Sequence, residues 1–291
     1  MKKLIAIAAV PALFLVACGS ADETATNDPA PSAAQAGEGT LDHPDFVRKQ
    51  ADPANYKVAR GSGEHRGSTI LSTCGSADDA QYVNDYNGSL GVSTQYVKDH
   101  KNPVGAMESS ATESSSAKYC SGTLIANDLF ITASHCVDTN TVANDYVAFN
   151  YERAAGSSTV LKQTHAKITE IVEDGLGGLD YAIVRVSGSP GATFGTTGTN
   201  STEVSTGAAL AIIQHPSGLP KKVEAGTKAG NSGDYLTYGN IDTQGGSSGS
   251  GVLNASGQLV GIHTNGGCTS SGGTNSGVRL SRIATASNII N

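Results

Sequence analysis

The stretch Asp242-Thr243-Gln244-Gly245-Gly246-Ser247-Ser248-Gly249-Ser250-Gly251 lies near the C-terminus and decides how the rest of the chain is interpreted. A nucleophilic serine has to project from a tight turn whose backbone N–H groups face an incoming carbonyl oxygen. Glycines such as Gly246 and Gly249 permit that backbone shape. A Gly/Ser-rich stretch by itself is also typical of a plain loop or linker. The choice between the two depends on what precedes it.

Two upstream stretches favour the catalytic interpretation. Leu129-Phe130-Ile131-Thr132-Ala133-Ser134-His135-Cys136 is a strand-like run that leads to a histidine, and Leu179-Asp180-Tyr181-Ala182-Ile183-Val184-Arg185-Val186 begins another strand with an acid. A lone histidine or aspartate at a strand end is more often structural. Three sites in the order His, Asp, Ser, separated by 45 and 68 residues, fit one domain that brings them together. The pattern therefore predicts a nucleophile, a base and an orienting acid.

With this order and these motifs the chain resembles the chymotrypsin-like serine peptidases, and most closely the bacterial branch of V8-type glutamyl endopeptidases and lysyl endopeptidases. The resemblance spans residues 120–268 and rests on Cys120–Leu124, Thr132–Cys136, Asp180–Val184, Gly245–Gly251 and Val260–His263. It implies an all-β fold of two six-stranded antiparallel Greek-key barrels (trypsin-like), with the active site between them and a short C-terminal helix. Two positions depart from the pattern without removing a catalytic group. Ser134 stands where alanine is usual, and Gly251 replaces a common proline.

The resemblance also implies a role for each residue of the site. Ser248 is expected to attack a peptide carbonyl, His135 to take and return the proton, and Asp180 to fix the histidine tautomer. The backbone N–H groups of Gly246 and Ser248 are expected to form the oxyanion hole. This chemistry calls for no cofactor and no metal.

The substrate side chain before the scissile bond is open between two alternatives. V8-type enzymes line their S1 pocket with a threonine five residues before the serine and a histidine fifteen after it. Here these are Thr243 and His263, which can both hydrogen-bond a glutamate carboxylate. Trypsin-like enzymes instead bind Lys or Arg with an acid six residues before the serine, here Asp242. We expect glutamate preference, with Lys/Arg preference as the alternative. Thr264 and Gly266 are expected to form the edge that pairs with an extended substrate.

The N-terminus predicts export and lipid attachment. Lys2-Lys3, the apolar run Leu4–Val16 and Leu15-Val16-Ala17-Cys18 together have the form of a bacterial lipobox. Residues 1–17 are thus expected to be a lipoprotein signal peptide, and Cys18 the lipidated residue. The apolar run is too short for a comfortable membrane span. We expect a protein anchored by lipid in the bacterial cell envelope, facing the periplasm or the cell surface, or released by processing. The alternative is an ordinary secretory signal with Cys18 incidental.

Composition divides the rest of the chain. From Gly19 to about Gly39 there are almost no large apolar side chains, which is typical of a flexible tether. The predicted parts are a tether or pro-segment at 18–55 and a peptidase domain at 56–291, with barrels at about 100–190 and 191–291. Removal of residues 1–17 takes away Lys2 and Lys3, so the formal net charge changes from −7 to −9. The sequence has no Lys/Arg cluster, so we expect no nucleic-acid partner. The resemblance implies polypeptide substrates, and we expect a monomer.

The cysteines suit an exported protein. With Cys18 assigned to lipid, four of the five remain, and four cysteines allow three pairings. The resemblance implies a Cys120–Cys136 bridge beside His135, which leaves Cys74 and Cys268 to join the N-terminal segment to the second barrel. The alternative is a zinc ion held by Cys120, Cys136 and His135. This spacing matches no zinc-finger pattern, and export favours disulfides.

Short β-branched runs separated by Gly, Asn, Asp and Ser indicate a β-barrel or sandwich. Strands are expected at residues 120–125, 128–132, 146–151, 166–172, 181–186, 208–213, 251–253, 258–263 and 277–280, and a helix within 280–290. Residues 40–103 are expected to be either a pro-segment or a surface addition held through Cys74.

Two other classes of function remain as alternatives. One is an inactive peptidase-like module that binds peptides from a lipid anchor, and the other is a structural envelope lipoprotein. A complete set of His135, Asp180, Ser248 and the oxyanion glycine favours an enzyme, because a binding module does not need all of them.

Overall fold

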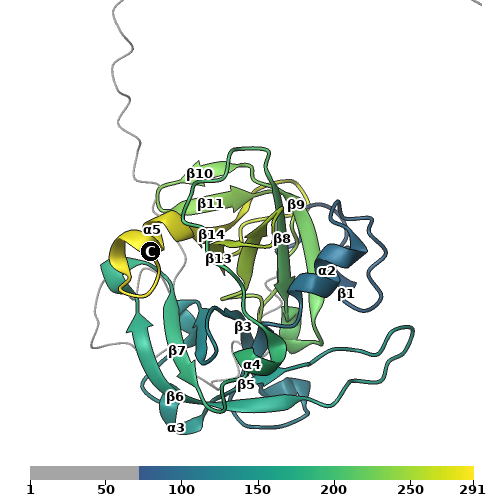
Figure 1. Cartoon of the computed structure of the whole chain (residues 1–291). Coiled ribbons are helices and arrows are strands. Elements are labelled where there is room, and N and C mark those ends of the chain that lie inside the picture. The colour runs from purple at the N-terminus through teal and green to yellow at the C-terminus, as the bar shows by residue number, and fades with distance from the viewer. Residues whose placement is uncertain (1–71) are drawn as a thin grey trace, which may run out of the picture. The chain divides into compact units, whose positions relative to one another are not determined.

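The computed structural model describes residues 72–291, which fold into two antiparallel β-structures (Figure 1). The first is a closed barrel with the strand order β2-β3-β4-β7-β6-β5. The second is an eight-stranded sheet with the order β1-β9-β8-β12-β13-β14-β11-β10. All strand pairs between named strands of this part are antiparallel. The predicted signal peptide, the lipid at Cys18 and the tether lie outside the described residues.

The strands and helices have the following bounds. The barrel strands are β2 Val104–Glu108, β3 Lys118–Leu124, β4 Leu129–Thr132, β5 Tyr146–Phe149, β6 Thr164–Asp174 and β7 Ala182–Val186. The sheet strands are β1 Gln81–Tyr82, β8 Ala209–Gln214, β9 Lys222–Thr227, β10 Gly230–Ser232, β11 Tyr235–Tyr238, β12 Gly251–Asn254, β13 Leu259–Asn265 and β14 Asn275–Arg279. The α-helices are α2 Thr94–His100, α3 Thr141–Asn144, α4 Gly191–Phe194 and α5 Leu280–Ala286. Short 3-10 helices cover Ser115–Ala117, Ser134–Cys136, Leu176–Gly178 and Pro216–Gly218.

The predicted fold class is confirmed: the described chain is mostly β, with a closed six-stranded barrel, a second sheet and a short C-terminal helix. The second sheet has eight strands where six were predicted, because the short strands β1 and β10 extend its two edges. The sequence did not reveal β1, β2, β9, β10 or β11. β2 has the sequence VGAME, with a single β-branched residue, yet all five of its residues are buried. Burial between β3 and β5 outweighs its weak strand propensity.

The N-terminal segment belongs to the second sheet although it precedes the first barrel. β1 pairs with β9 through Gln81 opposite Val223 and Tyr82 opposite Lys222. Nearer the start of the described chain, Ser72 forms an isolated antiparallel bridge with Thr243. The strand residues from 104 to 186 then build the barrel before the chain returns to the sheet at β8.

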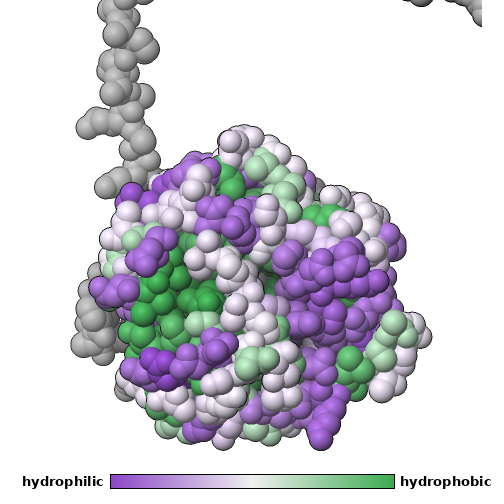
Figure 2. Space-filling model, viewed as in Figure 1, coloured by the Kyte–Doolittle hydropathy of each residue, from purple (hydrophilic) through white to green (hydrophobic). Residues whose placement is uncertain are grey.

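The surface of the described part is uneven in polarity. In the view of Figure 2, polar side chains cover the side of α2, and an apolar patch lies beside α5. Within residues 72–291 no helix is both long and apolar enough to cross a membrane.

Candidate active site

His135 and Asp180 are brought together by the pairing of two barrel strands. β4 pairs with β7, with Thr132 opposite Ala182, so the residues after one strand and before the other lie side by side. His135 Nδ1 is 2.7 Å from Asp180 Oδ2, and the backbone N–H of His135 donates to Asp180 Oδ1 at 2.9 Å. The Asp180 side chain is 3% exposed and that of His135 14%. The buried carboxylate therefore holds both the ring and the backbone of His135.

Ser134, one of the two residues that depart from the family pattern, has a structural partner. Its hydroxyl donates a hydrogen bond to Asp174 Oδ1 at the end of β6. A serine at this position thus attaches the 3-10 helix that carries His135 to the neighbouring strand.

The turn around Ser248 depends on two glycines with positive φ. Gly246 has a φ of 93° and Gly249 a φ of 86°, in the region that side chains avoid. A Cβ on Gly246 would lie 2.7 Å from the carbonyl oxygen of His215, and one on Gly249 would collide with Thr132 and Ser121. These contacts explain why the sequence places glycine two residues before and one residue after Ser248.

Ser121 of β3 joins this turn to the first barrel. Its backbone N–H donates to the carbonyl oxygen of Ser248 at 2.8 Å, and its hydroxyl donates to the carbonyl oxygen of Gly246 at 2.8 Å. The Sγ of Cys136, the residue after His135, lies 3.7 Å from the same Ser248 oxygen. The structure thus brings the Ser248 backbone next to the helix that carries His135. Ser121 belongs to the Cys120–Leu124 motif, but no local sequence signal predicts this bracing role.

The backbone N–H groups of the turn fall into two sets. Those of Ser247, Gly249 and Ser250 donate to carbonyl oxygens of Gln244, His263 and Ser247. Within the described part of the chain, the N–H groups of Gly246 and Ser248 donate to no protein acceptor. These are the two donors that the sequence analysis assigned to an oxyanion hole.

The 3-10 helix Pro216–Gly218 supports the turn from behind. The N–H of Ser217 donates to the Gly245 carbonyl oxygen at 2.5 Å, and Tyr151 donates its hydroxyl to the Gly218 carbonyl oxygen at 3.0 Å. The ring of Tyr151 stacks on His215, and burial, followed by the charge of Lys221, lowers the pKa of His215 to about 3. A neutral His215 is therefore part of this support.

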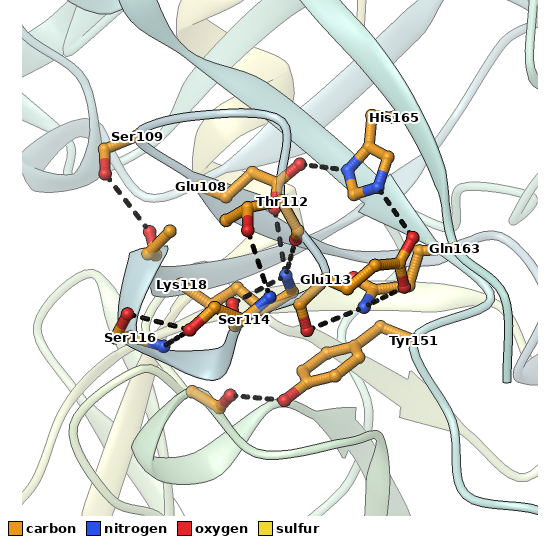
Figure 3. Close-up of polar contacts among 12 residues, drawn as sticks. Glu108, Ser109, Thr112, Glu113, Ser114, Ser116, Lys118, Tyr151, Gln163 and His165 are labelled. Atoms are coloured by element: carbon orange, nitrogen blue, oxygen red, sulfur yellow. Dashed lines mark hydrogen bonds and ion pairs between the residues drawn. The ribbon is translucent and has the colours of Figure 1, made fainter. Parts of the chain in front are cut away.

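A buried ionic cluster holds the barrel side of this support (Figure 3). Lys118 Nζ is 2.9 Å from Glu108 Oε2, and both side chains are fully buried. The ammonium also donates to the carbonyl oxygens of Thr112 and Ser114, and it lies 4.5 Å from the centre of the Tyr151 ring. Glu108 in turn binds His165 Nδ1 at 2.5 Å. This satisfied network fixes Tyr151 and the loop between β2 and β3.

The predicted S1 residues Asp242 and Thr243 lie against the N-terminal segment. Thr243 is buried, and its backbone exchanges hydrogen bonds with Ser72 at 3.1 and 3.4 Å. The Asp242 carboxylate accepts the backbone N–H of Cys74 at 2.6 Å and that of Asp79 at 3.3 Å. Burial raises the pKa of Asp242, and these two backbone hydrogen bonds oppose the rise. The bond between the Ser72 segment and Thr243 was not predicted, because no local sequence signal links them.

His263 has a buried tyrosine partner that the sequence did not reveal. Its Nδ1 lies 2.5 Å from the hydroxyl of Tyr238 on β11, and both residues are buried. Burial raises the pKa of Tyr238 well above its ordinary value, so the residue remains a phenol. Farther along β13, Thr264 is buried and Gly266 is exposed beyond the end of the strand.

The predicted disulfides are confirmed. Cys120 pairs with Cys136, and Cys74 pairs with Cys268. Because the sulfurs of Cys120 and Cys136 are joined to each other, the alternative of a zinc ion held with His135 does not apply. Cys74–Cys268 fastens the segment that contacts Asp242 to the second sheet.

This combination of closed barrel and second sheet is the architecture of the chymotrypsin fold. Residues 120–262, about half of the chain, match the family model of the trypsin-like peptidase domain. The chain therefore carries a trypsin-like peptidase domain, and its described part has the fold of the chymotrypsin-like serine peptidases. No curated protein matches the chain.

Solved structures share this fold at low sequence identity. A glutamyl endopeptidase in complex with MPD is 24% identical, with a TM-score of 0.50 over 71% of this chain and 93% of that one. The inactive form of the Rv3671c protease of M. tuberculosis is 17% identical, with a TM-score of 0.50 over 72% of this chain and 99% of that one. At these identities the likeness establishes the fold alone.

Proposed function

We propose that this protein is a serine endopeptidase in which Ser248, His135 and Asp180 hydrolyse peptide bonds through an acyl-enzyme. The observation that carries the proposal is the buried Asp180 carboxylate bound to His135 Nδ1 at 2.7 Å, next to the glycine-framed turn of Ser248. An inactive binding module would not need an oriented imidazole beside that turn. A structural lipoprotein would need neither the oriented imidazole of His135 nor the glycine-framed turn of Ser248.

The geometry supports a definite order of proton transfers. Because Asp180 accepts a hydrogen bond from the protonated Nδ1, the unprotonated Nε2 of neutral His135 is left as the base for the Ser248 hydroxyl. Ser248 Oγ bonds to the peptide carbonyl carbon while its proton passes to His135, and the C–N bond then breaks as the amine takes that proton. Water repeats the sequence to release the acid. The N–H groups of Gly246 and Ser248 would stabilise the oxyanion, and one such donor is worth about 2.7–4 kcal/mol of barrier.

We further propose that the enzyme prefers glutamate before the scissile bond. The Tyr238 hydroxyl can donate to His263 Nδ1, which would leave a proton on Nε2 for donation to a substrate carboxylate. Thr243 would supply a second hydroxyl donor. Asp242, the selector in the Lys/Arg alternative, is instead engaged with the backbone N–H groups of Cys74 and Asp79. The acids that gather near Asp242 are the one feature that favours the alternative.

Cleavage of matched chromogenic peptides with Glu, Asp, Lys, Arg or Phe at P1 tests both proposals. We expect turnover of the Glu peptide that is abolished in Ser248→Ala and reduced roughly 10⁴-fold in Asp180→Asn, which would present the wrong histidine tautomer. Ser250→Ala, a neighbouring serine, is the matched control and should retain activity. Preferred cleavage after Lys or Arg would assign the pocket to Asp242. The absence of any Ser248-dependent turnover would overturn the enzyme proposal.

We also propose that the protein is exported and anchored through a lipid on Cys18, which lies outside the described residues. The support is the sequence pattern Leu15-Val16-Ala17-Cys18 after a short apolar run. Incorporation of radiolabelled palmitate into the wild type but not into Cys18→Ala is the expected result. Equal labelling of both, or of neither, would contradict it.

A further inference from the structure

A cluster of carboxylates includes Asp242, and neither the proposed catalysis nor the proposed glutamate preference uses it. It joins three segments that are distant in the sequence: Asp78 of the N-terminal segment, Glu224 of β9 and Asp242. One carboxylate oxygen from each residue lies within 4.8 Å of the others. Like charges at this separation repel one another unless a proton or a cation lies among them.

Glu224 is the member of this cluster whose carboxylate oxygens receive no hydrogen bond from the described residues. Its side chain is completely buried. Leaving such a group without a partner is energetically unfavourable. Burial, with the charges of Asp79, Asp242 and Asp78, raises the pKa of Glu224 to about 9. The aimed but unpartnered carboxylate is thus a second sign, beyond proximity, of a ligand position.

The hydrogen bonds that Asp78 and Asp242 already accept leave lone pairs on their carboxylate oxygens that can bind a cation. The Asp242 oxygens each accept one backbone N–H, from Cys74 and from Asp79. Asp78 Oδ2 accepts the Gln244 side-chain amide at 2.9 Å and lies 3.7 Å from Lys222 Nζ. A carboxylate offers about four lone-pair positions, so each of these oxygens can still bind a cation.

We propose that Asp78, Glu224 and Asp242 hold a divalent metal ion, and we assign it as calcium. The donors are all carboxylate oxygens, which favour hard cations over zinc or copper. Calcium accepts irregular sets of six to eight oxygens at about 2.3–2.6 Å, whereas magnesium requires a near-ideal octahedron. Asp78 is exposed, so water can complete the shell and the ion can enter from its side.

The ion would cross-link the segment around Asp78 to β9 and to the S1 residues. A consequence that rests on the proposed glutamate preference concerns charge. A cation beside Asp242 would reduce the repulsion between these acids and a substrate carboxylate in S1. Calcium is therefore expected to lower KM for the Glu peptide more than for the Phe peptide.

Calcium binding and thermal melting of the full-length chain test the site without relying on activity. All proteins carry Ser248→Ala to prevent self-cleavage and are stripped with EDTA before addition of CaCl2, MgCl2 or KCl at matched ionic strength. We expect one bound calcium per chain by equilibrium dialysis and a rise in Tm of about 5 °C or more at saturation. Glu224→Gln and Asp78→Asn should each lose most of the rise and of the binding.

Glu170→Gln, which removes an exposed acid of β6 in the other β-structure, is the matched control and should keep both effects. A calcium effect that persists in Glu224→Gln and Asp78→Asn would place the ion elsewhere and overturn the proposal. The absence of calcium binding to the protein would also overturn the proposal. So would a rise in Tm that KCl produces as well as CaCl2. Equal binding of magnesium would overturn the assignment to calcium. A failure of peptide cleavage would leave these readouts unchanged, so it is distinguishable from failure of the site.

Discussion

The residues of the site differ in how they act. His135, Asp180 and Ser248 would carry the chemistry, and their types and order alone suggested it. Ser121, Ser72 and Tyr238 act through others, by holding the Ser248 turn, Thr243 and His263 respectively. Such residues have no motif, because any chain segment that arrives at the right place can supply the hydrogen bond.

Tyr238→Phe is the residue-scale prediction, since it removes only the hydroxyl next to His263 Nδ1. We expect KM for the Glu peptide to rise about 10-fold, equivalent to one hydrogen bond of about 1.4 kcal/mol, with kcat changed much less. The Phe peptide should show no comparable change. Tyr86→Phe, which removes a buried tyrosine hydroxyl that donates to Val92, is the control. A similar KM change for both peptides would argue against Tyr238 as a positioning residue.

At the scale of elements, the two disulfides brace different halves of the site. Cys120–Cys136 closes a short loop of 16 residues that carries His135, whereas Cys74–Cys268 spans 194 residues and fastens the segment next to Asp242 and Thr243. Loss of the Cys120–Cys136 bridge should therefore disturb the position of the base His135. Loss of the Cys74–Cys268 bridge should disturb the substrate pocket.

Replacing each pair by serine tests this division. Chain entropy predicts a loss in the free energy of unfolding of about 3 kcal/mol for Cys120→Ser/Cys136→Ser and about 5 kcal/mol for Cys74→Ser/Cys268→Ser. Urea unfolding measures the losses, and peptide kinetics should show mainly a kcat defect for the first pair and mainly a KM defect for the second. The reverse order of stability, or identical kinetic defects, would contradict the assignment.

The elements that the sequence did not reveal share a physical cause. Strand β2 is too poor in β-branched residues to be recognised, and β1 and β10 have only two and three residues. Their pairing energy comes from neighbours distant in the sequence, such as β5 for β2 and β14 for β11. By contrast, β7 is a run of buried apolar residues with a local signal strong enough to be predicted.

At the scale of the whole molecule, buried acids give opposite pH dependences. Burial alone would raise the pKa of Glu152, but Lys221 and Lys101 outweigh it and lower the pKa to about 2. Glu152 therefore stabilises the fold above its ordinary pKa of about 4.5, and this stabilisation is lost as the pH falls toward 2. The raised pKa of Glu224 has the opposite effect: it makes the fold less stable as the pH rises.

Between pH 4.5 and about 9, native Glu224 keeps a proton that the unfolded chain releases. Because the native state then binds more protons, stability falls as the pH rises through this window. In calcium-free buffer, Glu224→Gln should flatten this decline, and urea unfolding at pH 5, 7 and 8.5 measures it. Glu170→Gln, an exposed acid, should follow the wild type. An unchanged slope in Glu224→Gln would refute the prediction.

The sequence by itself determined the class of the protein. The spacing of His135, Asp180 and Ser248, the glycines around Ser248 and the alternation of strand-like runs are local features that can be seen without coordinates. It also indicated both disulfides through resemblance and elimination. These features are visible because each catalytic or turn residue must be of one chemical type to function.

Only the tertiary structure decided what surrounds those residues. It placed the N-terminal segment against Thr243, directed Asp242 toward the N–H groups of Cys74 and Asp79, and buried Tyr238 against His263. It also gathered Asp78 and Glu224 beside Asp242. The physical reason is that these contacts join segments up to about 170 residues apart, so they depend on strand pairing and burial across the fold and leave no pattern in the local sequence.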